Sequence, residues 1–141
     1  MMNRRYSLPV HFSTYITILI GIVLFTVKNF CSIEGEWGIE DHYLVKPLTG
    51  LHLLTTPFLI FFVGSIFHFH IYLKLKHKTK ELRPSGYLLI FSFVLMAFSG
   101  ISIQILMSAE IRETAVTIHN VATFSWIIFY GVHHFNGRKT K

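Results

Sequence analysis

The chain has 141 residues, of which 52% are hydrophobic and 16% aromatic, and its formal net charge is +6 at pH 7. So short and apolar a chain excludes a soluble multidomain protein and leaves room for one compact domain. The basic residues stand in short blocks beside long apolar runs, so a membrane explains the charge better than nucleic acid, and we expect no nucleic-acid partner. The single cysteine, Cys31, excludes an intramolecular disulfide and any zinc site built on several thiolates.

Four apolar stretches are each long enough to cross a bilayer as a helix. Such a helix needs about 20 mostly apolar residues, because it covers roughly 30 Å of hydrocarbon at about 1.5 Å per residue. The second stretch contains Pro57 and the fourth is the least hydrophobic, yet both keep enough apolar length if their polar residues face the interior of a helix bundle. The sequence predicts an all-α integral membrane protein with a single transmembrane domain, residues 1–141. Its spans lie approximately at 10–31, 50–73, 86–107 and 114–135.

Charges at the ends of the spans predict their direction. Lysine and arginine gather at the N-terminus, between the second and third spans and in the C-terminal tail, whereas the other two loops carry six acidic residues against only Lys46 and Arg112. By the positive-inside rule, both termini are cytoplasmic and the acidic loops face outward. Short connections make neighbouring spans antiparallel, which gives an up-down-up-down four-helix bundle.

Histidine is unusually frequent for so apolar a chain, with nine residues. Ionisable side chains are costly inside membrane helices, usually face the bundle interior and are candidates for a functional site. The chain has no C-x-x-C-H motif, so any haem would be held by axial ligands and packing alone, as in b-type cytochromes. Seven histidines lie within or at the ends of the predicted spans: His11, His52, His68, His70, His119, His133 and His134.

Two histidines of the fourth span share one helix face. His119 and His133 are 14 residues apart, a rotation of about 1400°, which is about 40° short of four full turns. Their separation along the helix axis is roughly 21 Å, so one lies near the outer and the other near the inner membrane surface. A single metal cannot bridge that distance, whereas two stacked haems, each bound by one of these histidines, would fit it.

Each haem needs a second histidine at the same depth on another helix. At the outer level His52, near the outward end of the second span, is the candidate, and it pairs with His119. His68 is a poor match, because it lies about 160° away from the face of His52.

Several histidines could complete the inner level. His70 returns to the face of His52 but lies about 27 Å further along the helix, deeper toward the cytoplasm than His133 requires. His11 stands at the start of the first span. We prefer His11 with His133, and keep His70 as the alternative to His11 and His134 as the alternative to His133.

The four apolar segments together resemble a known family. They read RRYSLPVHFSTYITILIGIVLFT, LTGLHLLTTPFLIFF, RPSGYLLIFSFVLMAFSGISIQI and TIHNVATFSWIIFYGVHHFNG. In this order they are similar to the helices of the four-helix cytochrome b (gamma) subunits of membrane-bound formate dehydrogenases and of related nickel-iron hydrogenase and thiosulfate reductase b-type cytochromes. The similarity covers nearly the whole chain, and the histidine spacing of the fourth segment is its specific feature.

The resemblance implies two haem b groups, one ligated by His52 and His119 near the outer face and one by His11 and His133 near the inner face. It also implies a quinone, menaquinone or ubiquinone, reduced close to the inner haem, although Gly86 in ELRPSGYLL is about the only match there. An iron-sulfur or other redox partner subunit would stand outside, and lipid would surround the helices. The chain would then be an electron-transfer subunit rather than a complete enzyme, in the cytoplasmic (inner) membrane of a prokaryote, passing electrons between that partner and the quinone pool.

A haem-free histidine-rich membrane protein, either a metal transporter or a structural anchor subunit, is the alternative. An intramembrane histidine can serve only as an interhelical hydrogen-bond donor, worth about 0.6 to 2 kcal/mol, and this role fits His68. A metal path usually brings carboxylates into the membrane, and none of the seven Asp and Glu residues lies in the middle of a span. Four glycines would allow another group to approach the helix backbone closely: Gly21, Gly64, Gly100 and Gly131. The sequence does not show whether that group is a flat ring or another helix.

Overall fold

The computed structural model describes residues 4–35, 38–76 and 83–139. It is about 87% helical and divides the chain into two compact units, Met1–His70 and Ile71–Lys141, each of which is described by itself. The predicted all-α class is confirmed, and so are four helices long and apolar enough to cross a membrane, of which the fourth has the lowest mean hydropathy, as expected. They run over Tyr6–Phe30, Val45–Ile66, Pro84–Ile105 and Ala109–Asn136.

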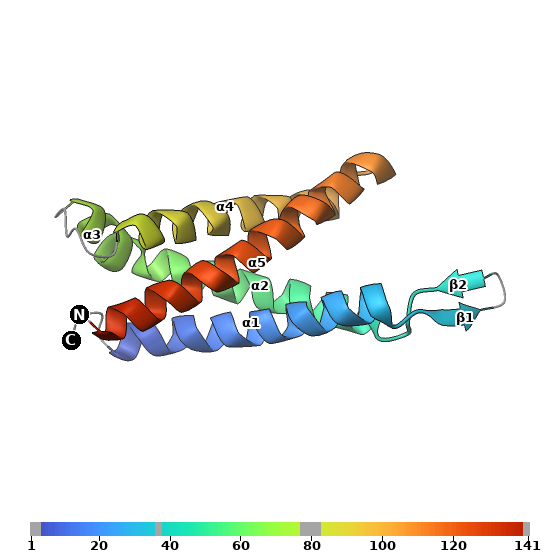
Figure 1. The fold of residues 1–141 in the computed structure, drawn as a ribbon, viewed down its shortest axis with the longest axis horizontal. Coiled ribbons are helices and arrows are strands. Elements are labelled where there is room, and N and C mark those ends of the chain that lie inside the picture. Colours follow the sequence, from blue (N-terminus) through green and yellow to red (C-terminus); the bar gives the residue numbers. More distant parts are fainter. Residues whose placement is uncertain (1–3, 36–37, 77–82, 140–141) are drawn as a thin grey trace. The chain divides into compact units, whose positions relative to one another are not determined.

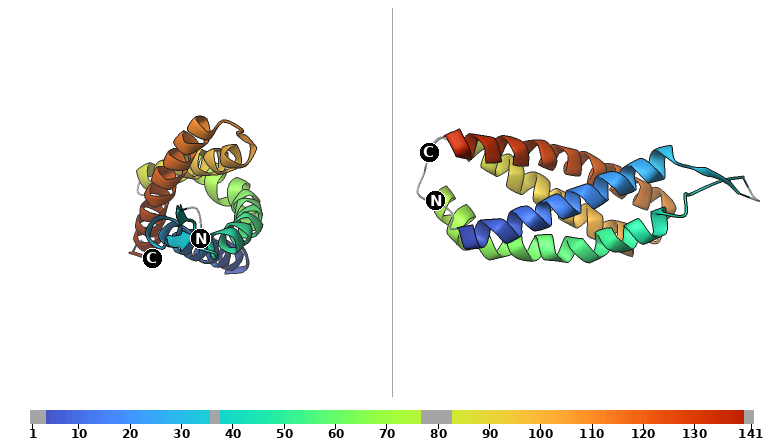
Figure 2. Two further views of the ribbon diagram at one scale, coloured as in Figure 1. Left: turned by 90° about the vertical axis from the view of Figure 1, so that its right-hand side faces the viewer. Right: turned by 90° about the horizontal axis from the view of Figure 1, so that it is seen from below.

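The first unit is a helical hairpin extended by a small β-ribbon. Helices α1 (Arg4–Phe30) and α2 (Val45–Ile66) lie side by side and run in opposite directions (Figures 1 and 2). Strands β1 (Ile33–Gly35) and β2 (Gly38–Glu40) form the antiparallel ribbon that connects them. The π-helix η1 (Phe67–Tyr72) directly follows α2.

Both helices of the first unit begin earlier than the apolar stretches predict. Helix α1 includes Pro9 in its second turn, where the missing N–H removes one helical hydrogen bond. Helix α2 has Pro47 in its first turn, where backbone N–H groups have no helical partner in any case. Hydropathy marks the part of a helix that matches the hydrocarbon layer, so it misses polar turns that continue the helix beyond that layer.

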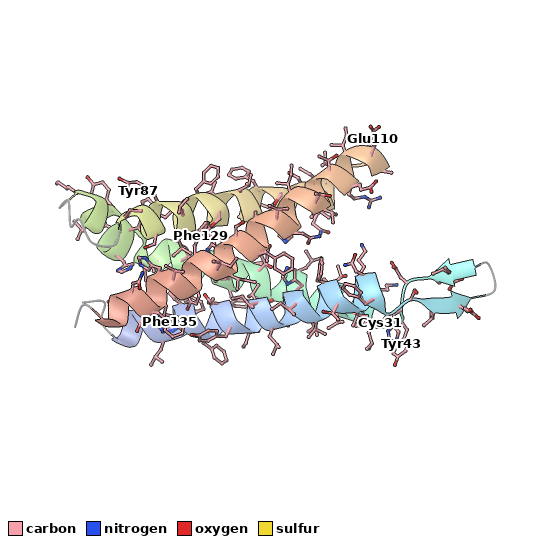
Figure 3. The ribbon with its side chains drawn as sticks, viewed as in Figure 1. Cys31, Tyr43, Tyr87, Glu110, Phe129 and Phe135 are labelled. Atoms are coloured by element: carbon pink, nitrogen blue, oxygen red, sulfur yellow. The ribbon has the colours of Figure 1, made fainter. Side chains whose placement is uncertain are left out.

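The ribbon lies in a segment for which we predicted only a loop. Gly38 has φ 119°, a conformation that glycine adopts far more readily than residues with a Cβ. Cys31, which is exposed, and Tyr43 lie at the base of the ribbon (Figure 3). The register pairs Ile33 with Glu40, Glu34 with Ile39 and Gly35 with Gly38.

The π-helix η1 contains His68 and His70. A π-helix closes hydrogen bonds from residue i to i+5, so each turn contains more residues than an α-helical turn and each residue turns by less. The face that we predicted for His70 assumed α-helical rotation throughout. That assumption is wrong for this segment, and the phase of His70 relative to His52 differs from the predicted one.

The second unit is a hairpin of two long helices that follows a short one. It consists of α3 (Leu73–Lys76), α4 (Arg83–Ile105) and α5 (Ala109–Lys139), with α4 and α5 side by side (Figures 1 and 2). Glu110 lies at the end of this hairpin where α4 connects to α5, and Tyr87 lies at the opposite end (Figure 3). The connection is short, so α4 and α5 are adjacent and antiparallel.

Polar and apolar side chains both suit these helices to a membrane. Large apolar side chains are exposed on all four long helices, for example Phe12, Phe61, Phe91 and Phe124, which is compatible with contact to lipid. Many hydroxyl groups donate to a carbonyl one turn back in their own helix, which removes the cost of an unpaired polar group in hydrocarbon. Such bonds are formed by Ser13, Thr26, Thr49, Thr56, Ser65, Ser92, Ser99, Ser102 and Ser125. In contrast, the buried hydroxyls of Thr14, Thr17 and Thr123 have no hydrogen-bond partner among the residues that the structure describes.

Candidate functional site

The predicted ligands are distributed over both units. The first unit contains His11 on α1, His52 on α2 and the alternative His70 in η1, whereas α5 of the second unit carries His119, His133 and the alternative His134. All six are half-buried, and His68 is exposed. Each proposed pair, His52 with His119 and His11 with His133, joins one residue from each unit, so the pairs stay predictions.

His119 packs against α4 of its own unit. Its Nδ1 lies 2.9 Å from the carbonyl oxygen of Met96 and 3.3 Å from Ser99 Oγ. The ring also fills the space above Gly100, where an added Cβ would stand 3.1 Å from Cε1 and 3.3 Å from Nδ1. The Nδ1–Cε1 edge of the imidazole therefore faces α4.

The bond to Met96 determines which ring nitrogen of His119 carries the hydrogen. A carbonyl oxygen only accepts, so Nδ1 is the donor, and in the neutral imidazole the lone pair is then on Nε2. In an α-helix the carbonyl of residue 96 points toward residue 100, and Gly100 has no side chain to cover it. Glycine at this position thus makes room for the ring and exposes its hydrogen-bond acceptor. Neutral histidine with its other nitrogen held by a hydrogen bond is the usual form of a metal ligand.

His133 has a similar contact with α4 one level away. Its Nδ1 lies 3.2 Å from Ser85 Oγ, and a Cβ added to Gly86 would stand 3.8 Å from its Cε1. We call the serine and glycine that contact one of these histidines its seat. Ser85–Gly86 and Ser99–Gly100 are 14 residues apart (99 − 85), which is also the spacing of the two histidines (133 − 119). Because α4 and α5 are antiparallel, equal spacing on both helices places the same contact at two levels.

His52 shares part of this arrangement in the first unit. A Cβ added to Gly21 of α1 would stand 3.1 Å from Cε1 and 3.6 Å from Nδ1 of His52. Among the glycines that the structure describes, Gly21, Gly86 and Gly100 are those whose added Cβ would meet a histidine. The histidines concerned are the three whose face and depth had already selected them from the sequence.

The other candidates have aromatic surroundings instead. The ring of His11 stacks on Tyr15, with centroids 6.4 Å apart and planes at 24°. The ring of His134 stacks on Tyr130 at 6.1 Å and 12°, and Tyr130 in turn stacks on Trp126 at 5.4 Å. His11 therefore stays the predicted inner partner.

The sequence analysis did not predict the contacts between these histidines and α4, although it predicted close approach at some of the glycines involved. Of the four glycines expected to permit close approach, Gly21 and Gly100 meet an imidazole, whereas an added Cβ on Gly64 or Gly131 would have nothing within 4 Å. The serines and the Met96 carbonyl were not predicted. A signal was present, because the dipeptide Ser-Gly recurs in α4 at the spacing of the two histidines.

The chain matches no protein-family model, and no curated protein or solved structure is significantly similar to it. The resemblance to cytochrome b subunits thus stays a prediction. Within the described ranges there is no group of three or more His, Cys, Asp or Glu side chains placed to hold one metal ion. The geometry of the seated histidines is what bears on function.

Proposed function

We propose that the protein is a dihaem b-type cytochrome subunit that transfers electrons across a membrane between a redox partner and the quinone pool. The observation that supports this most is the seat of His119, where Nδ1 donates to the Met96 carbonyl. The lone pair is then on Nε2, the state in which histidine binds haem iron. A second seat 14 residues away presents His133 on the same face, roughly 21 Å along α5.

The proposed ligand pairs are His52 with His119 and His11 with His133, and the alternatives for the inner pair are His70 and His134. When bound, the two haems supply the one-electron chemistry. The chain would hold the imidazoles in one orientation, bury the cofactors between apolar helices and set their potentials through the hydrogen bonds on the imidazoles.

The proposal includes a membrane orientation. By the positive-inside rule, the basic flanks predict that both termini are cytoplasmic and that the acidic ribbon segment and the α4–α5 connection face outward. The four helices then form an up-down-up-down bundle in the inner membrane of a prokaryote. An iron-sulfur or other redox subunit would dock outside, and menaquinone or ubiquinone would react near the inner haem.

The alternative is a haem-free metal transporter or anchor subunit. It would also account for a single hydrogen bond between a histidine of α5 and α4. It gives no reason for the same Ser-Gly contact to recur on α4 at the spacing of His119 and His133. Two cofactors held at two depths do give such a reason, and we therefore favour the cytochrome.

The test is the reduced-minus-oxidised optical spectrum of the purified protein, together with haem extracted into pyridine. We expect a sharp α-band and two haems per chain. The variant carrying both His119→Ala and His133→Ala is the control, because it should lose both haems and keep its helical circular dichroism. A purified protein with no α-band and no extractable haem would end the proposal in favour of the alternative.

A further inference from the structure

We propose that α4, which supplies none of the proposed ligands, is the helix that positions the histidines of α5, through Ser85 for His133 and through Ser99 and Gly100 for His119. The inference rests on the proposed function, since it concerns the haem that each histidine would bind. It assigns one role to the two serines and another to Gly100, with Gly86 as the comparison. Both roles follow from contacts inside the second unit.

The glycine sets how closely the ring approaches α4, and the two seats differ in this respect. A Cβ on Gly100 would stand 3.1 Å from Cε1 of His119, closer than side-chain carbons usually approach, so the ring would have to move by a few tenths of an ångström. That movement would carry Nδ1 away from the Met96 carbonyl. A Cβ on Gly86 would stand 3.8 Å from His133, an ordinary van der Waals contact. Alanine should therefore disturb the seat of His119 and be accepted in the seat of His133.

The serine supplies an acceptor for the ring hydrogen, which at His119 is shared with the Met96 carbonyl. The hydroxyl of Ser99 donates to the carbonyl of Leu95 at 2.7 Å, so its oxygen can accept from His119 Nδ1 at 3.3 Å. Ser85 Oγ lies 3.2 Å from His133 Nδ1, and a histidine bound to iron through Nε2 would donate to it from Nδ1. Such an acceptor makes the imidazole more basic, which stabilises ferric over ferrous haem and lowers the midpoint potential.

The two seats should act independently. They are 14 residues apart on α4, roughly 21 Å along the helix, and each serine contacts the histidine at its own level. A change in Ser99 or Gly100 should affect the haem held by His119. A change in Ser85 should affect the haem held by His133.

The experiment measures midpoint potentials in proteins that hold one haem each. Ser99→Ala is made in the His133→Ala protein and Ser85→Ala in the His119→Ala protein, and each is followed by redox titration and by the low-spin haem signal in electron paramagnetic resonance. We expect both potentials to shift upward and Ser→Thr at the same positions to restore them. Ser102→Ala on the same helix is the matched control, because the Ser102 hydroxyl donates within the helix, to the Phe98 carbonyl one turn back. Unshifted potentials in both serine variants would overturn the inference.

Haem affinity tests the glycines. Gly100→Ala in the His133→Ala protein should weaken haem binding by about 10- to 100-fold, the usual cost of disturbing the outer shell of a metal site. Gly86→Ala in the His119→Ala protein should bind haem as before. Equal effects of the two substitutions would contradict the unequal distances on which the inference is based.

A measurement without haem separates this inference from the proposed function. Protein labelled with ¹⁵N-histidine and prepared free of haem should show the His119 resonances of a ring protonated at Nδ1. A ring protonated at Nε2 alone would overturn the positioning role whether or not the protein binds haem. Absence of haem from the unsubstituted protein would end the proposed function, whereas bound haem with unmoved potentials would end only the inference.

Discussion

The contact that best characterises a candidate ligand is the one His119 makes with α4. It depends on the main-chain carbonyl of Met96 and on the absence of a side chain at Gly100. Neither is a side chain that a search for binding-site residues would select. The carbonyl cannot be removed by mutating Met96, so the orientation of this ring is tied to the helix backbone itself. The histidine is therefore the residue to change first.

His119→Ala should remove the outer haem and leave the inner one, because the seat of His133 is separate. The measurement is the number of haems per chain, from pyridine extraction and protein determination, with an expected fall from two to one. His68→Ala is the control and should keep both haems, since His68 is exposed. Two haems per chain in the His119→Ala protein would refute the assignment.

Gly21→Ala tests the contact between α1 and His52. Alanine in place of an unhindered helical glycine should stabilise the fold by about 0.5 to 1 kcal/mol, as we expect for Gly64→Ala, where an added Cβ meets nothing within 4 Å. At Gly21 the Cβ would stand 3.1 Å from His52, and overpacking typically costs about 1 to 3 kcal/mol. Unfolding in mixed micelles should therefore show Gly21→Ala to be less stable than Gly64→Ala. Equal stabilities would mean that the His52 ring moves aside freely.

The sequence predicted the histidines better than it predicted their neighbours. The 14-residue spacing is enough to place His119 and His133 on one face, since it depends only on helix geometry. Finding Ser99 and Gly100 opposite His119 requires the register between two helices, which the periodicity of either helix alone does not contain.

At the scale of elements, the transition from α2 to η1 affects the choice of inner ligand. His70 lies in η1, where the rotation per residue differs from that of an α-helix. The four long helices were predictable, because a run of about 20 apolar residues is typical of a membrane-spanning helix and of little else. The ribbon was not, because strands of three residues are too short to show alternation, and the π-helix has no periodic signature of its own.

Replacing each inner candidate in turn decides between α1 and η1. Under the proposed ligation, we expect His11→Ala to lose the inner haem and His70→Ala to keep it, as judged by haem per chain in a His119→Ala protein, which should hold only the inner haem. Loss with His70→Ala but not with His11→Ala would mean that the π-helix supplies the ligand. His134→Ala tests the alternative on α5 in the same way, and we expect it to keep the inner haem.

At the scale of the whole molecule, the chain consists of two helical hairpins, each with several hydroxyl groups bonded within their own helix and many large apolar side chains exposed. Composition predicted four helices long and apolar enough to cross a membrane, which the structure confirms, whereas the direction that the charges indicate stays a prediction. The pairing of one hairpin with the other depends on side-chain packing and on any cofactor between them, and neither has a sequence periodicity.

Cys31 is a built-in probe of orientation, because it is the single cysteine, is exposed and lies at the base of the ribbon (Figure 3). A membrane-impermeant maleimide should label it in cells whose outer barrier has been opened while the inner membrane is intact. The control is Cys31→Ser combined with Asn136→Cys, whose exposed position near the C-terminus should react only after the membrane is permeabilised. The reverse pattern would invert the proposed topology.

One consequence concerns how the protein is made. Both seated histidines of the second unit lie on α5, which follows α1, α2 and α4 in the chain, and each proposed pair takes one ligand from it. A ribosome therefore makes the segment that completes both pairs after the helices that hold the other two ligands. Under the proposed ligation neither haem can acquire its second axial bond before α5 has been synthesised, so cofactor loading would follow insertion of all four described spans.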